Sequence, residues 1–189
     1  MKTSAAEFLI GLDLGQKHDF STFAVLERRS GAAPCYHLRH LERLDLNTPY
    51  PAVAQRAHLL VAMTGCHGRT QLVMDLTGVG APVFDLLRTA GVRPVAITIT
   101  GGRSVSGSLE HLHVPKRMLI RTLAALYGSG RLKIAEKIPY ARELNEELLN
   151  FQVKINRRTR QESYGAKGAR KHDDLVLALA LAAFYAERN

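Results

Sequence analysis

The sequence predicts an α/β domain in which a mixed five-stranded sheet is flanked by helices. Three apolar, β-prone segments follow one another directly near the N-terminus, whereas the later strand-like segments alternate with helix-like ones. Direct connections allow antiparallel pairing and helical crossovers allow parallel pairing, so both arrangements in one chain indicate a mixed sheet. The chain has 189 residues, of which 46% are hydrophobic, so we expect one domain with one core over residues 1–189.

The five expected strands cover residues 8–14, 21–27, 35–46, 71–75 and 92–99. The first two, FLIGLDL and STFAVLE, are joined by a tight turn that begins at Gly15, so they should pair antiparallel. The third alternates loosely between apolar and polar residues. The last two are continuous apolar runs, which is typical of strands that are covered on both faces.

Helices are expected over residues 51–63 and 79–90, from Pro115, from Pro139, and over residues 172–188. Pro suits the first turn of a helix because its missing N–H has no partner there, and Gly91 suits the end of the second helix. Residues 152–169 are polar, basic and contain glycine, which indicates a β-hairpin or a loop before the last helix.

Acidic residues occur at three places where an expected strand or helix ends or begins. Asp13 lies in the first apolar strand, Asp75 closes the strand LVMD, and the pair Asp173 and Asp174 opens an apolar helix. A turn or a helix cap would explain each one alone, but carboxylates brought together from distant segments repel one another unless a cation lies between them. Oxygen-only clusters suit Mg²⁺ or Mn²⁺. The leading hypothesis is therefore metal-dependent phosphodiester chemistry.

A basic segment over residues 154–171 directly precedes the paired aspartates. It contains Glu162 as its one acid and seven cationic residues: Lys154, Arg157, Arg158, Arg160, Lys167, Arg170 and Lys171. Charge runs are usually solvated loops, but the position of this one favours contact with the phosphate backbone of a nucleic acid. Lys116, in the helix that Pro115 opens, is either a surface residue or a further phosphate contact.

The composition favours a polyanionic partner and a reducing compartment. The formal net charge is +9, which attracts nucleic acid or anionic lipid. Cys35 and Cys66 have neither zinc-site spacing nor a disulfide framework, as is usual in the cytosol. The N-terminal apolar run is broken by Asp13, and the longest apolar stretch, residues 175–186, is too short to cross a bilayer, so we expect no membrane association.

In their order and spacing, these segments resemble the nuclease domain of viral large terminases, the DNA-packaging enzymes of tailed phages. The resemblance begins with GLDLGQKHDFSTFAVLE, VMDLTGVGAPVFDLL and the ITITGG loop. It continues through VPKRMLIRTLAALYGSGRLKI and FQVKI to HDDLVLALALA, and so covers nearly the whole chain. It implies a ribonuclease H-like fold, like that of Holliday-junction resolvases, with the basic hairpin as an addition before the last helix.

The same resemblance implies cleavage of DNA by two Mg²⁺ or Mn²⁺ ions, held by Asp13, Asp75 and either Asp173 or Asp174. It also implies DNA, expected to be duplex, as the partner, in the cytoplasm of a bacterial or phage-infected cell. A complete large terminase carries an ATPase motor domain, and nothing in this chain resembles a Walker A loop. The chain begins about ten residues before its first acid, so we expect an excised domain or a stand-alone relative. A stand-alone relative would need a separate ATPase motor or other packaging components.

Two other classes of function are compatible with the residues. Actin-like and sugar-kinase-like ATP-binding modules also use Asp-x-Gly followed by Ser/Thr in their first phosphate loop, here residues 13–15 and 21–22. That fold needs a second phosphate loop and about twice this length. A non-catalytic DNA-binding protein is supported by the charge alone. ATP turnover, metal-dependent nicking or metal-independent binding would distinguish the three.

Overall fold

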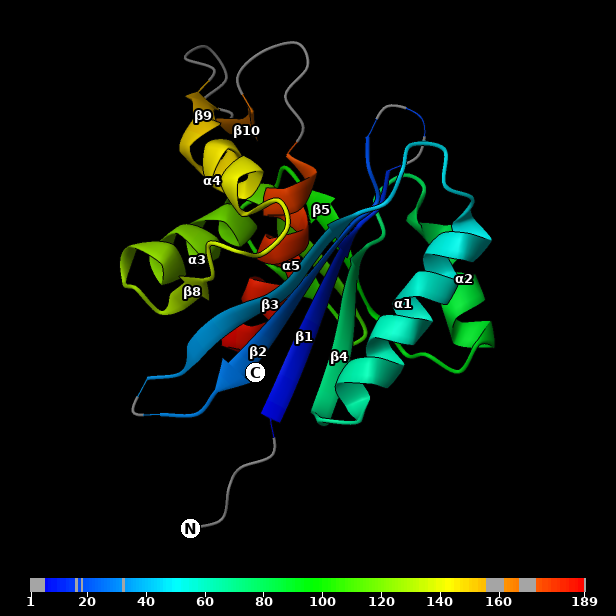
Figure 1. The fold of residues 1–189 in the computed structure, drawn as a ribbon. Coiled ribbons are helices and arrows are strands. Elements are labelled where there is room, and N and C mark those ends of the chain that lie inside the picture. The colour runs from blue at the N-terminus through cyan, green and yellow to red at the C-terminus, as the bar shows by residue number, and fades with distance from the viewer. Residues whose placement is uncertain are drawn as a thin grey trace.

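The main sheet has eight strands in the order β6-β7-β5-β4-β1-β2-β3-β8 (Figure 1). The computed structural model describes residues 6–15, 17, 19–31, 33–155, 162–166 and 173–188, including their side chains except those of residues 150–155 and 162–166. The strands of this sheet are β1 (Ala6–Asp13), β2 (Thr22–Arg29), β3 (Cys35–Arg43), β4 (Gly68–Asp75), β5 (Val95–Thr100), β6 (Ser106–Gly107), β7 (His111–Pro115) and β8 (Leu132–Ile134).

Helices cover both faces of the sheet. They are α1 (Tyr50–Gly65), α2 (Gly80–Thr89), α3 (Lys116–Gly128), α4 (Ala141–Asn150) and α5 (Asp174–Arg188). Figure 1 shows α1 and α2 on one face and α3, α4 and α5 on the other, and each face has its own apolar core. A separate antiparallel hairpin of β9 (Phe151–Ile155) and β10 (Glu162–Ala166) precedes α5. None of the helices in the described ranges combines the length and the apolar character that a membrane span requires.

The expected mixed α/β architecture is confirmed, with the antiparallel β1–β2 pair, the parallel β1–β4 and β4–β5 pairs, and the hairpin before α5. The sheet has three more strands than the five expected. The additional strands β6, β7 and β8 have two, five and three residues. Runs this short carry little periodic signal, and β8 forms only by pairing with the distant strand β3.

Alternation along β1 directs its odd-numbered residues towards α5. Leu9 belongs to the core beneath α5, and its even-numbered neighbours belong to the core beneath α1. At Gly11, a Cβ atom would lie 1.8 Å from the carbonyl oxygen of Ala178, so only glycine allows α5 to pack this closely against the strand. Asp13, two residues further, therefore lies on the same face, near the start of α5.

Candidate active site

A row of four polar side chains crosses adjacent strands on the face covered by α5. Asp13 is paired with Thr22 of β2, and Thr22 with Arg43 of β3. Asp75 ends the neighbouring parallel strand β4, beside Asp13. It faces α5 because Val73, two residues earlier, belongs to the core beneath that helix. The sheet thus places two acids, a hydroxyl and a guanidinium opposite the first turn of α5.

Asp13 is the centre of an acidic cluster. It is only 8% exposed, and burial raises its pKa well above the usual value for an aspartate. Three other carboxylates also raise this pKa, each by less than burial does: Asp75, Asp174 and Asp173. The positive charge of Lys116 acts in the opposite direction. Among the described residues, the site therefore contains more buried negative charge than the ammonium group of Lys116 offsets, which a further cation would relieve.

Asp75 has a similar but milder environment. Burial raises its pKa, while hydrogen bonds from Thr77 and the charge of Lys116 lower it. The Thr77 N–H donates to Oδ1 of Asp75 at 2.8 Å, and this bond turns the chain directly after β4. The carboxylate of Asp75 is thus held at the strand end where sequence reasoning placed it.

Asp173 and Asp174 have different partners although they are adjacent. Oδ2 of Asp173 accepts a hydrogen bond from Nζ of Lys116 at 2.8 Å, and both side chains are about a quarter exposed. Asp174 is buried and binds the guanidinium of Arg43 with both oxygens, at 2.7 Å and 3.1 Å. The hydroxyl of Thr22 also donates to Oδ2 of Asp174, at 2.5 Å. Asp174 is therefore held on two sides, and Asp173 faces the lysine.

Sequence reasoning missed Arg43 and Glu147, which complete this end of α5. The guanidinium of Arg43 forms an ion pair with Glu147 of α4 as well as with Asp174. The other carboxylate oxygen of Glu147 accepts the N–H of Val176 at 3.2 Å, in the first turn of α5. Burial raises the pKa of Glu147 to about 7, the charge of Asp174 adds to that shift, and Arg43 only partly offsets it.

The structure brings together five of the predicted site residues: Asp13, Asp75, Lys116, Asp173 and Asp174. Lys116 proves to be a neighbour of the acids and not an isolated surface residue. Lys154 lies in β9, at the end of the molecule where α5 begins (Figure 1), but its side chain is outside the described part of the structure. The other predicted cations also lie outside the described residues: Arg157, Arg158, Arg160, Lys167, Arg170 and Lys171.

The donor chemistry of the cluster fits a hard divalent cation. Among the described residues, no three His, Cys, Asp or Glu side chains are arranged to hold one metal ion together. Two of the four aspartates are instead ion-paired, Asp173 with Lys116 and Asp174 with Arg43. The available ligands are nevertheless all carboxylate oxygens, which Mg²⁺ and Mn²⁺ prefer, and the raised pKa of Asp13 marks an excess of negative charge.

The residues of the hypothetical ATP loop have other partners. The hydroxyl of Ser21 donates to the carbonyl of Gly15 at 2.9 Å and accepts the Gly15 N–H at 3.3 Å. That of Thr22 donates to Asp174. These bonds close the turn between β1 and β2 and fasten α5, so the geometry disfavours a phosphate-binding loop here.

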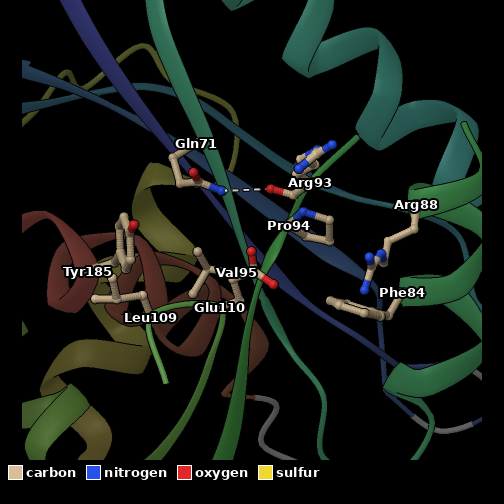
Figure 2. Close-up of a pocket in the computed structure, with 9 residues that line it drawn as sticks. All are labelled: Gln71, Phe84, Arg88, Arg93, Pro94, Val95, Leu109, Glu110 and Tyr185. Atoms are coloured by element: carbon tan, nitrogen blue, oxygen red, sulfur yellow. Dashed lines mark hydrogen bonds between the residues drawn. The ribbon is translucent and has the colours of Figure 1, made fainter. Parts of the chain in front are cut away.

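A separate pocket lies beside the middle of β4 and the start of β5 (Figure 2). Its lining includes Gln71, Phe84, Arg88, Arg93 and Leu109. The side chain of Gln71 donates to the carbonyl of Arg93 at 3.0 Å, which ties the two strands together. None of the four aspartates lines this pocket, so it is not part of the acidic cluster.

Comparison with known proteins relates this chain to phage terminase large subunits, although no protein-family model matches it. The terminase large subunit of Thermus phage G20c is 30% identical over 177 residues, which cover 93% of this chain and 31% of that protein. This chain is homologous to one part of a terminase large subunit. It spans about a third of the length of the curated relatives that it matches.

Solved terminase nuclease domains have the same fold. That of bacteriophage SPP1, with bound Mn, superposes with a TM-score of 0.59 at 10% identity and covers 93% of this chain and 84% of its own. That of human cytomegalovirus, soaked with Mn, gives 0.55 at 15% identity and covers 93% and 81%. The expected resemblance to terminase nuclease domains is thus confirmed, together with the ribonuclease H-like fold.

Proposed function

We propose that this chain is a divalent-metal-dependent endonuclease that cleaves phosphodiester bonds of DNA by a two-metal mechanism. The observation that carries the proposal is the buried carboxylate of Asp13, whose pKa is raised by burial and by acids from β4 and the start of α5. Such a cluster is costly to keep charged until a cation enters it. Homology to terminase large subunits and the fold of their nuclease domains support this choice of chemistry.

In this mechanism Asp13, Asp75 and the Asp173–Asp174 pair would hold the metal ions. Two Mg²⁺ or Mn²⁺ ions bound there would activate the attacking water and stabilise the leaving 3′ oxygen. Lys116 lies beside the acids with its ammonium group on Asp173, so it can contact a phosphate oxygen of the substrate once the acids are neutralised. Burial of Asp13 and Asp174 keeps bulk water away from their carboxylates and so strengthens their hold on a cation.

The substrate proposed is duplex DNA, bound along the basic segment that precedes α5. The net charge of +9 and the position of that segment before Asp173 support a phosphate-backbone track. Its proposed contacts are Lys154, Arg157, Arg158, Arg160, Lys167, Arg170 and Lys171. In a packaging role the chain would work in the cytoplasm with an ATPase motor, either in the same polypeptide or as a separate partner.

Nicking of supercoiled plasmid in Mn²⁺, Mg²⁺ or EDTA tests the proposal. The wild type should cut only with metal, and Asp13→Asn should lose the activity. Asp85→Asn, an exposed substitution on α2, is the matched control and should cut like the wild type. Cutting in EDTA or by Asp13→Asn would contradict the mechanism, and ATP turnover without nicking would favour the kinase-like alternative.

Thermal melting gives a second readout that does not depend on activity. Asp13→Asn removes a buried charge that its neighbours repel, so it should raise the metal-free Tm by a few degrees. Mn²⁺ should raise the Tm of the wild type and of Asp85→Asn, and should raise that of Asp13→Asn much less. An equal Mn²⁺-induced rise in all three proteins would remove Asp13 from the proposed ligands.

A further inference from the structure

Arg43 is the centre of a cluster of side chains at the start of α5, which we call the Arg43 clamp. Its guanidinium pairs with Asp174 and Glu147, and only 14% of its side chain is exposed. The rings of Phe20 and Tyr140 lie 5.2 Å and 5.8 Å from the guanidinium carbon. The five residues of the clamp come from β3, α4, α5 and the segments before β2 and α4. One side chain thus connects the sheet, α4 and the helix that carries the last two acids.

A β-bulge places Arg43 in this position. Leu26 of β2 pairs with Leu38 of β3, but Val25 pairs with His40, so Arg39 is one extra residue in β3. Without the bulge, Glu42 would lie opposite Thr22, and a fifth carboxylate would approach Asp174. The irregular register therefore puts a cation where the regular one would put an acid.

Stability alone is a poor explanation for the clamp. A buried ion pair contributes little net stability, because the loss of hydration offsets most of the attraction. The cost of burying the charged form shows in the pKa of Glu147, because burial raises that pKa more than Arg43 lowers it. Tyr140 also has a φ of 62°, a left-handed conformation that is unfavourable for a bulky residue. What such a cluster can provide instead is one fixed geometry.

The clamp fixes α5 at two points of its first turn. Arg43 and Thr22 together donate three hydrogen bonds to the carboxylate of Asp174, which leaves it one orientation. Glu147, held by the same guanidinium, accepts the N–H of Val176. Any rotation of this turn would move Asp173 and Asp174 relative to Asp13.

We propose that Arg43 is a positioning residue of the metal site, which orients Asp174 directly and holds the first turn of α5 through Glu147. The inference rests on the proposed function, because it concerns how the same acids are presented to a cation. Arg43 acts through its hydrogen bonds to Asp174, in the way that outer hydrogen-bond partners orient metal ligands. Loss of such partners typically weakens metal binding by about 10–100-fold.

The other end of α5 offers a matched control. Arg131 binds Glu187 with two hydrogen bonds, at 2.8 Å and 2.6 Å, and its guanidinium carbon lies 5.7 Å from the ring of Tyr36. This cluster also joins an arginine, a carboxylate and an aromatic ring to α5, but it lies at the end of the helix away from the acids. A substitution there loosens the helix without touching Asp174.

The proposal is tested by measuring Mn²⁺ binding to the full chain in Arg43→Lys and Arg131→Lys. The electron paramagnetic resonance signal of free Mn²⁺ reports how much of the metal is bound. Both variants keep the charge and lose the planar fork that grips a carboxylate. Arg43→Lys should bind Mn²⁺ at least about tenfold more weakly, whereas Arg131→Lys should bind like the wild type. Thr22→Val removes the other donor to Asp174 and should weaken binding in the same direction. It replaces Arg43→Lys if melting in EDTA shows that variant to be unfolded.

The outcomes separate the clamp from the metal site itself. A folded Arg43→Lys with wild-type Mn²⁺ affinity would overturn the positioning role. Equal weakening in Arg43→Lys and Arg131→Lys would also overturn it, since the effect would then be general loosening of α5. A wild type that binds no Mn²⁺ at all would overturn the proposed function, and the role of Arg43 with it.

Discussion

Each end of α5 is held by an arginine that pairs with a glutamate, but the pKa of that glutamate is lowered at one end and raised at the other. At the C-terminal end, the side chains of Arg131 and Glu187 are 27% and 28% exposed, and the hydrogen bonds from Arg131 lower the pKa of Glu187. At the N-terminal end, the side chain of Asp174 is 3% exposed, and burial raises the pKa of Glu147 to about 7.

The difference shows what burial does to the same pair of chemical groups. Where water still reaches the carboxylate, the arginine favours its charged form at little desolvation cost. Where water is excluded, the arginine only partly offsets the desolvation of Glu147, and the neighbouring charge of Asp174 adds to the cost. The exposed cluster therefore holds the helix in place, and the buried one keeps costly charge close to the acids proposed to bind metal.

Replacing each arginine with alanine should change the free energy of unfolding most and give the largest difference between the two ends of α5. Arg43→Ala leaves Asp174 and Glu147 without their buried partner, so the free energy of unfolding should fall by about 3–5 kcal/mol. Arg131→Ala breaks a partly exposed pair and should cost no more than about 1 kcal/mol. Urea denaturation of the metal-free proteins measures both values. Similar losses would mean that burial does not distinguish the two ends.

The pH dependence of stability should differ in sign between the two glutamates. The folded-state pKa of Glu147 lies above its ordinary value of 4.5, so its contribution is present below pH 4.5 and is lost as the pH rises through about 7. That of Glu187 is lowered, so its contribution is present above its ordinary pKa and is lost as the pH falls below it.

Melting curves of Glu147→Gln and Glu187→Gln, measured against the wild type without metal, test this contrast. Between pH 4.5 and 7 the wild type should lose about 1–3 kcal/mol of stability relative to Glu147→Gln. Below pH 4.5 it should lose stability relative to Glu187→Gln by a smaller amount. The comparison fails if both differences change in the same direction with pH.

Salt should have the smallest effect. Raising NaCl from 0.1 M to 1 M screens charges that water reaches, and it affects buried pairs much less. The destabilisation caused by Arg131→Ala should therefore shrink by a few tenths of a kcal/mol, while that caused by Arg43→Ala should stay the same. Chemical denaturation with urea, which adds no ionic strength, gives both numbers. If the destabilisation caused by Arg43→Ala shrinks with salt, Arg43 is more accessible to water than its contacts indicate.

The candidate acids could be found from the sequence because their signals are local. Asp13 and Asp75 close apolar runs, and Asp174 begins an apolar helix, so each position follows from the pattern within a few residues. The antiparallel β1–β2 pair was also predictable, since a tight turn leaves little choice. The parallel β1–β4 pair, which places Asp75 beside Asp13, was not, because β2, β3 and α1 lie between the two strands. The DNA-binding role of the basic residues over 154–171 stays a prediction.

What surrounds those acids was decided by the tertiary structure. Glu147 lies in the polar helix ARELNEELLN, whose sequence does not distinguish it from its exposed neighbour Glu146 until α4 packs beside α5. Arg43 reaches Asp174 because of a bulge that shifts the register of β3 by one residue. Short-range periodicity encodes the five longer strands, the helices and the acids at their ends, so these could be predicted from local sequence, whereas the short strands β6, β7 and β8 could not. The partners of Asp174, namely Thr22 and Arg43, depended on register and packing between residues more than a hundred positions apart, which no local pattern contains.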